Sequence, residues 1–225
     1  MNCCDRGPPM SFSTIFQELY MSFFPDNIEG IVAVGGSFLG DWDWLAKAVA
    51  PLPLYNHAIS GTLMDATYAS MDFQVVQSQP RLVVYCNGGD DILQNVPAEK
   101  IAGNFSEYCE RLHKHCPATN ILFMSILNTV KQSRSGRSDE IVKANSLIKD
   151  MCDKTDHVHF LELNFVLLER DGRYKENIFS IFNDHTPTNK VFYATYHILY
   201  PATKMVWESA GGKHFKDNEH WWPEA

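Results

Sequence analysis

The sequence predicts an α/β fold with about five mostly parallel strands and helices on both faces of the sheet. Short runs rich in Val, Ile and Leu alternate with longer stretches whose apolar residues recur at helical spacing. The first run, Ile31–Val34, is apolar throughout, as expected for a strand that is buried on both faces. With 225 residues and 45% hydrophobic content, the chain is long enough for one well-buried domain.

Each expected strand is a short apolar or β-branched run that is bounded by turn residues or charges. In order these are Ile31–Val34, Leu54–Ile59, Arg81–Cys86 (RLVVYC), Asn120–Leu127 (NILFMSIL) and His157–Leu163 (HVHFLEL). Strands that alternate with helices form βαβ units, which gives a mostly parallel sheet.

The expected helices lie between these strands and after the last one. They are Trp42–Ala50, Met64–Gln77, Pro97–His115, Asp139–Cys152 and Thr188–Tyr200. Pro51 and Pro53 end the first helix, while Pro97 suits the first turn of the third. The polar segment Gln132–Ser138 (QSRSGRS) is expected to be an exposed loop.

Composition argues against several classes of protein. A net charge of −8 disfavours nucleic acid or an anionic membrane surface as the main partner. No stretch approaches the roughly 18 apolar residues of a transmembrane segment, and the N-terminus lacks the features of a secretory signal. The six cysteines have neither metal-site spacing nor the density of a disulfide scaffold, which predicts an intracellular, cytoplasmic protein. We expect no cofactor and no metal.

We expect three segments along the chain. Residues 1–27 form an N-terminal extension, residues 28–209 the α/β domain and residues 210–225 a C-terminal tail. Apolar residues of the first segment recur at the spacing of an amphipathic helix, namely Phe12, Ile15, Phe16, Leu19, Tyr20 and Phe23. This helix either packs on the domain or docks on a partner or lipid, so both extensions are candidate sites for protein partners.

The residues just after the strands are the candidates for function, because ligands of parallel sheets bind outside the carboxyl ends of the strands. Ser37 follows the first strand on a glycine turn in IVAVGGSFLGDW, and Gly61 follows the second in YNHAISGT. Asn87–Asp91 follow the third strand, and His185 precedes the last helix. Acyl transfer by serine needs a hydroxyl on a sharp turn, an imidazole to accept its proton and donors for the oxyanion.

In this order the residues resemble the SGNH, or GDSL, hydrolases, which are flavodoxin-like esterases and lipases. The resemblance runs from about Ile28 to Trp207. The stretches that resemble the first, second, third and fifth conserved blocks of the family are, in order, VGGSFLGDW, LYNHAISGTLMDAT, LVVYCNGGDDI and ENIFSIFNDHTPTNKVFYATYHILYPA. It implies a three-layer flavodoxin-like sandwich and a serine esterase or acylhydrolase that acts on a small ester. Ser37 would be the nucleophile and His185 the base, with Gly61 and either Asn87 or Asp90 at the oxyanion.

Several positions depart from the family's pattern. Gly36 replaces the aspartate before the nucleophile. The third-block asparagine falls on Asp90, or on Asn87 if the turn has gained a residue. An ionised carboxylate beside a developing oxyanion would repel it.

The acid that usually lies three residues before the histidine falls on Phe182, which leaves Asp184 as the nearest substitute in sequence. His197 as the base would place Ala194 at the acid position, so neither register restores the pair. Two functions therefore stay open at the level of sequence. The chain is a working esterase, or it is a degenerate hydrolase fold that serves as a structural or binding subunit of a larger assembly.

Overall fold

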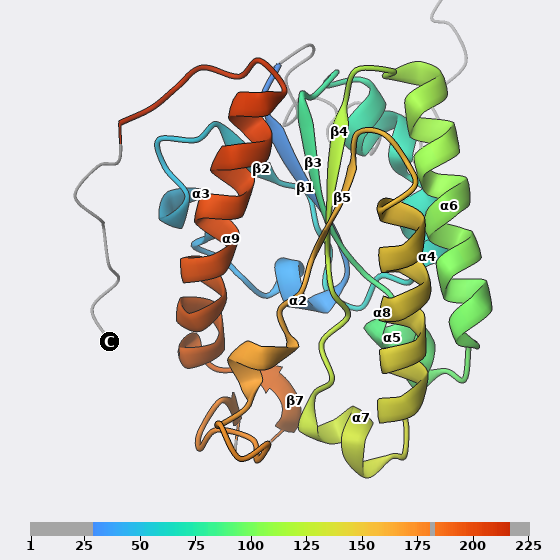
Figure 1. The fold of residues 1–225 in the computed structure, drawn as a ribbon, viewed down its shortest axis with the longest axis vertical. Coiled ribbons are helices and arrows are strands. Elements are labelled where there is room, and N and C mark those ends of the chain that lie inside the picture. The colour runs from blue at the N-terminus through green and yellow to red at the C-terminus, as the bar shows by residue number, and fades with distance from the viewer. Residues whose placement is uncertain (1–28, 181–182, 217–225) are drawn as a thin grey trace, which may run out of the picture.

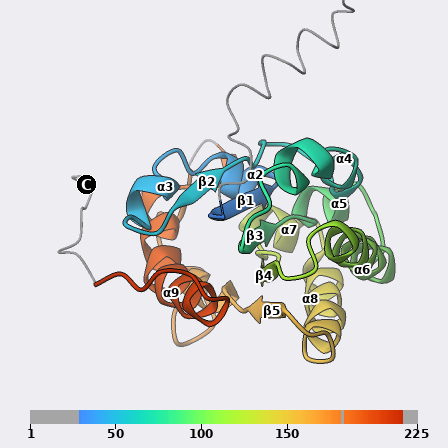
Figure 2. The same ribbon diagram turned by 90° about the horizontal axis from the view of Figure 1, so that it is seen from above.

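A five-stranded, entirely parallel sheet forms the centre of the computed structural model, which describes residues 29–180 and 183–216. Its strand order is β2-β1-β3-β4-β5. The strands are β1 (Ile31–Gly35), β2 (Leu54–Asn56), β3 (Leu82–Cys86), β4 (Asn120–Met124) and β5 (Val158–Leu161). Helices lie on both sides of the sheet (Figures 1 and 2). The expected α/β sandwich with five strands is therefore confirmed.

The register of the strands brings their carboxyl ends to one edge of the sheet. Ile31 pairs with both Leu54 and Leu82, so β1 lies between β2 and β3. At the other end of this pairing Gly35 lies opposite Cys86. The loops that follow β1 and β3 therefore start side by side, which is what a site built from both loops requires.

Helices of different length cover the two faces of the sheet (Figure 2). On one face lie α2 (Ser37–Gly40), α3 (Leu45–Ala48) and α9 (Asn189–Ser209). The other face is covered by α4 (Met64–Ala69), α6 (Ala98–His115) and α8 (Ser138–Cys152), together with the π-helical turn Asp72–Val76. Short helices α5 (Gly89–Leu93) and α7 (Val130–Arg134) lie near the carboxyl edge (Figure 1).

The core consists of two apolar clusters that the sheet separates, because successive side chains of a strand point to opposite faces. Aromatic residues fill both clusters. Trp42 stacks on Phe192 of α9 with ring centroids 5.0 Å apart. On the opposite face the rings of Phe105 and Phe123 are 4.5 Å apart.

Some elements differ from the sequence-based expectation. The expected helix Trp42–Ala50 is helical only over Leu45–Ala48, and the last helix passes Pro201 and ends at Ser209. The segment 132–138 is not simply an exposed loop, because Gln132 is buried within α7. An antiparallel pair, β6 (Phe179–Ser180) and β7 (Asn183–Pro187), and a 3-10 turn over Asn164–Leu167 were not expected.

Two of the three expected segments fall largely beyond the described part of the chain. The expected N-terminal extension, residues 1–27, lies outside the described residues, as do residues 217–225 of the expected tail. Within 29–180 and 183–216, no helix combines the length and the apolar character needed to span a bilayer.

Candidate active site

Ser37 lies at the carboxyl end of the first strand, as the sequence predicts. The chain leaves β1 through Gly35, whose φ of +138° is rarely adopted by other residues. A Cβ at Gly35 would lie 1.9 Å from the carbonyl oxygen of Cys86, so only glycine allows β1 and β3 to approach this closely here. Ser37 then opens the short helix α2, and its side chain is partly exposed at the sheet edge.

The hydroxyl of Ser37 is held between a donor and an acceptor from two other loops. The backbone N–H of Gly61 donates a hydrogen bond to Ser37 Oγ at 2.9 Å. Ser37 Oγ in turn donates to Asp90 Oδ2 at 2.8 Å. The loops after β1, β2 and β3 therefore meet at this single hydroxyl group.

Asn87 is buried behind this group, and its side chain is engaged elsewhere. Its Nδ2 donates to Thr67 Oγ1 at 2.8 Å, and its Oδ1 accepts from the N–H of Gly88 at 2.8 Å. The same Oδ1 lies 2.8 Å from the point that a Cβ on Gly36 would occupy. The side chain of Asn87 thus fills the space beside Gly36, which is a physical reason for glycine before Ser37.

Asp91 is buried next to Asp90 but faces another element. Its two carboxylate oxygens accept from the N–H of Met64, the first residue of α4, at 3.2 and 3.3 Å. Burial raises the pKa of Asp91, while the hydrogen bond from Met64 acts in the opposite direction. Asp91 therefore anchors α4 and, through it, the loop that carries Gly61.

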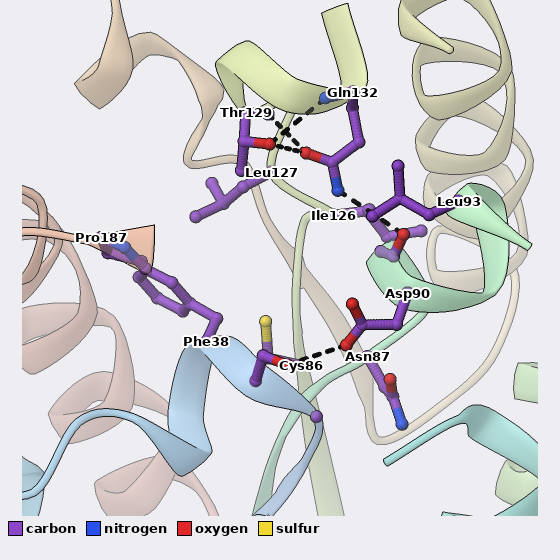
Figure 3. Close-up of a pocket in the computed structure, with 13 residues that line it drawn as sticks. Phe38, Cys86, Asn87, Asp90, Leu93, Ile126, Leu127, Thr129, Gln132 and Pro187 are labelled. Carbon is purple, nitrogen blue, oxygen red and sulfur yellow. Dashed lines mark hydrogen bonds between the residues drawn. The ribbon is translucent and has the colours of Figure 1, made fainter. Parts of the chain in front are cut away.

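A cavity of about 70 Å³ opens beside Ser37 (Figure 3). Its apolar walls come from Phe38, Leu93, Ile126, Leu127 and Pro187. Polar groups are few, and the cavity thus has the composition of a small-molecule site, with apolar walls and a few fixed polar groups.

Besides Ser37 and Asn87, three further polar or ionisable side chains line this cavity: Asp90, Thr129 and Gln132. Cys86 also lines the cavity, but burial raises its thiol pKa to about 12, so the thiol stays neutral at physiological pH. Among the described residues, no group of three or more His, Cys, Asp or Glu side chains is arranged to hold a metal ion.

Gln132 is a site residue that our interpretation of the sequence missed. Thr129 and Gln132 form a capping box at the start of α7. The side chain of Gln132 also reaches back to the carbonyl oxygen of Gly89 at 3.5 Å, which connects α7 to the turn that carries Asp90. The signal was present in the sequence, since Thr-x-x-Gln is the spacing of a capping box.

The structure leaves the predicted base and acid untested. His185 and Asp184 belong to β7, whose last residue, Pro187, lines the cavity. The side chains of His185 and Asp184 lie outside the described part, and so does Phe182.

Of the alternative bases, His197 is exposed on α9, where its ring lies 5.4 Å from that of Tyr196. His197 is not among the residues that line the cavity with Ser37. The described residues that line this cavity include no histidine.

Comparison with known proteins identifies the family to which the chain belongs. The profile of the GDSL-like lipase/acylhydrolase family matches residues 31–181, the region that contains all five strands and both Ser37 and Asp90. The chain belongs to the GDSL-like lipase/acylhydrolase family. No curated protein sequence matches it at a significant level.

Solved structures with the same fold come from distant relatives. A candidate platelet activating factor from Streptococcus pneumonia is 16% identical, with a TM-score of 0.70 over 84% of this chain and 91% of that chain. A GDSL-like lipase from Bacteroides thetaiotaomicron is 13% identical, with a TM-score of 0.69 over 88% and 98% of the two chains.

A carbohydrate esterase of family 3 from Talaromyces cellulolyticus is also 13% identical, with a TM-score of 0.59 over 80% and 98%. At such identities the likeness extends to the fold alone. The site must therefore be argued from its own residues.

Proposed function

We propose that this chain hydrolyses a small acyl ester through a covalent intermediate on Ser37. The observation that carries the proposal is the hydrogen bond from the Gly61 N–H to Ser37 Oγ at 2.9 Å, at the mouth of an apolar cavity. A backbone N–H that already points at the nucleophile is well placed to stabilise the oxyanion that forms when Ser37 attacks a carbonyl. Membership of an acylhydrolase family supports the same reaction.

The cavity favours esters of short acyl groups. Its volume of about 70 Å³ is small, and its walls are mostly apolar. A small apolar space of this kind suits a short acyl chain better than a long one. Phe38 and Leu127, two of the apolar lining residues, would contact that chain, while the alcohol would extend toward solvent.

The sequence nominates His185 as the base and Asp184 as its possible acid. Asn87 and Asp90 were the two candidates for a side-chain contribution to the oxyanion site. Because Asn87 bonds to Thr67 and Gly88, we assign the oxyanion contacts to backbone N–H groups, those of Ser37 and Gly61.

One observation favours a second candidate function. The carboxylate of Asp90 lies 2.8 Å from Ser37 Oγ, and an ionised carboxylate offers no donor to an oxyanion. A degenerate hydrolase that binds a ligand or a partner protein without turnover would tolerate this carboxylate. The extensions at the two termini would then be the candidate contacts to that protein.

Hydrolysis of aryl acetate and aryl butyrate by purified protein distinguishes these functions. We expect slow turnover by the parent chain, and we expect Ser37→Ala to reduce it to the rate without enzyme, because removal of a serine nucleophile costs several orders of magnitude in kcat. Ser60→Ala, a change at an exposed serine near the site, is the matched control and should keep the parent rate. Equal turnover by Ser37→Ala and the parent would rule out the proposed mechanism.

A further inference from the structure

The side-chain amide of Gln132 forms part of the wall of the cavity beside Ser37, and it is buried there. Gln132 is only 5% exposed and lines the cavity together with the apolar residues Leu93, Ile126 and Leu127. A primary amide has one oxygen that accepts and two N–H groups that donate, and buried polar groups are normally hydrogen-bonded. The partners of Gln132 therefore show which part of the amide is left for a ligand.

Thr129 engages the oxygen of this amide. Gln132 Oε1 accepts from the backbone N–H of Thr129 at 2.9 Å and also from the Thr129 hydroxyl group. Because a backbone N–H can only donate, the amide atom that faces it must be the oxygen. The capping box thus fixes the orientation of the amide, and Nε2 is the atom left on the other side. Figure 3 shows the oxygen directed at Thr129 and the nitrogen directed away from it.

The nitrogen of the amide has spare capacity to donate. Among the described residues, Gln132 Nε2 reaches one acceptor, the carbonyl oxygen of Gly89, at 3.5 Å. This distance exceeds the ordinary N–H···O range of about 2.7–3.2 Å, and the second N–H has no described partner. A Cβ at Gly89 would lie 3.3 Å from Nε2, so the glycine leaves room beside the nitrogen. A buried donor is therefore available at the wall of the cavity.

We infer that Gln132 donates a hydrogen bond to the acyl group of the substrate, and that the preferred ester carries a neutral acceptor oxygen in a short acyl chain. This inference rests on the proposed function of Ser37. An ether, ketone or hydroxyl oxygen would satisfy the donor, whereas an alkyl chain would cover it and leave it unpaired. Asp90 lines the same cavity, and its carboxylate disfavours an acyl group that brings a second negative charge.

Gln132 would therefore determine selectivity between esters and would not take part in the bond-making steps. The apolar lining residues distinguish poorly between a methylene group and an ether oxygen, because the two are similar in size. A donor that loses its water to an alkyl chain, by contrast, is penalised, and this is how hydrogen-bonding sites reject analogues that lack the matching group. We expect an effect of about tenfold on kcat/KM, which corresponds to one hydrogen bond of ordinary strength.

Pairs of para-nitrophenyl esters in which oxygen replaces one methylene group test this inference. One pair is the methoxyacetate and the butyrate, and the other is the β-methoxypropionate and the pentanoate. Selectivity is the kcat/KM of the oxygen-containing ester divided by that of the alkyl ester. Comparing this ratio between the parent and a variant cancels the difference in intrinsic reactivity between the two esters.

Gln132→Met keeps the length of the side chain but removes both donors. We expect it to lower the selectivity about tenfold in at least one pair. Gln132→Glu is a second variant that retains the capping box, and at alkaline pH its ionised carboxylate has no donor, so it should lower the selectivity too. Gln94→Met, the same change at an exposed glutamine outside the cavity, is the matched control and should keep the parent selectivity.

The selectivity separates a contact with the substrate from a merely structural role. Loss of packing at Gln132 would slow both esters of a pair alike and leave their ratio unchanged. Thermal unfolding of each variant checks that it folds.

Two results are decisive against the inference. If both Gln132 variants hydrolyse the esters with the parent selectivity in both pairs, the inference is overturned, and the proposed function stands because Ser37-dependent turnover is still observed. If the parent hydrolyses none of these esters, or if its turnover persists in Ser37→Ala, the proposed function is refuted and the inference with it.

Discussion

Gly36 and Asn87 fit together directly behind the nucleophile loop. A Cβ at Gly36 would lie 2.8 Å from Asn87 Oδ1 and 2.9 Å from the carbonyl oxygen of Thr62. Asn87 cannot move freely, because it is buried and bonded to both Thr67 and Gly88. Gly36 stands where the family has an aspartate, and the side chain of Asn87 fills the space beside Gly36.

We therefore expect Gly36→Ala to destabilise the fold by about 1–3 kcal/mol, as is usual when a group is forced into a packed interior. The midpoint of urea unfolding measures this change. Gly103→Ala is the control, since a Cβ there has open space within α6, and it should stabilise the protein by about 0.5–1 kcal/mol. If Gly36→Ala is as stable as the parent, the side chain of Asn87 is not fixed as described.

The site residues could be predicted from sequence only in part. Ser37 and Gly61 were predicted because they follow expected strands of the sheet, and the structure brings the two into hydrogen-bond contact. Their catalytic roles stay predictions. The choice between Asn87 and Asp90 could not be made, because both follow β3 within four residues and a turn can present either one. The hydrogen bond that engages the side chain of Asn87 comes from Thr67 in α4, 20 residues away in the chain, so the sequence does not show it.

At the level of the elements, α9 shows how tertiary packing extends a helix past a proline. Pro201 has no N–H to donate and usually ends a helix, so the sequence predicted an end at Tyr200. The helix nevertheless continues to Ser209. Thr203, Val206 and Trp207 beyond the proline are all buried, and their burial offsets the lost hydrogen bond.

Pro201→Ala should accordingly stabilise the protein, because alanine restores a backbone donor inside a helix that packing already holds. The gain has an upper limit of about 3 kcal/mol, the difference between proline and alanine in a helix interior. The midpoint of thermal unfolding should rise. A fall in the midpoint would mean that the proline ring itself contributes essential packing contacts on α9.

Element length explains which helices and strands were predictable. The strands β1, β3 and β4 are fully buried and appear as continuous apolar runs, and α6 and α8 are long enough to show helical spacing. Helices α5 and α7 have five residues each, which is too short for a periodic pattern. Strands β6 and β7 pair with each other, and neither shows the continuous apolar run that identified β1, β3 and β4 in the sequence.

For the molecule as a whole, the fold and the chemistry follow from different residues. Solved relatives that are 13–16% identical reach TM-scores of 0.59–0.70, because the pattern of buried strands and helix faces can persist while individual residues change. The strand order collects the loops after β1, β2 and β3 at Ser37. A single residue beside the nucleophile, such as Asp90, can change the catalytic activity of this shared fold. The activity is therefore a property to measure on this chain.

Our central claim is that Ser37 carries the acyl group during turnover. The most direct measurement is an acid quench of the parent protein during hydrolysis of an aryl ester, followed by peptide mass spectrometry. We predict the acyl group on the peptide that contains Ser37, at Ser37, and its absence in Ser37→Ala. An acyl group found on another residue, or turnover without any acylated peptide while Ser37→Ala stays active, would contradict the account.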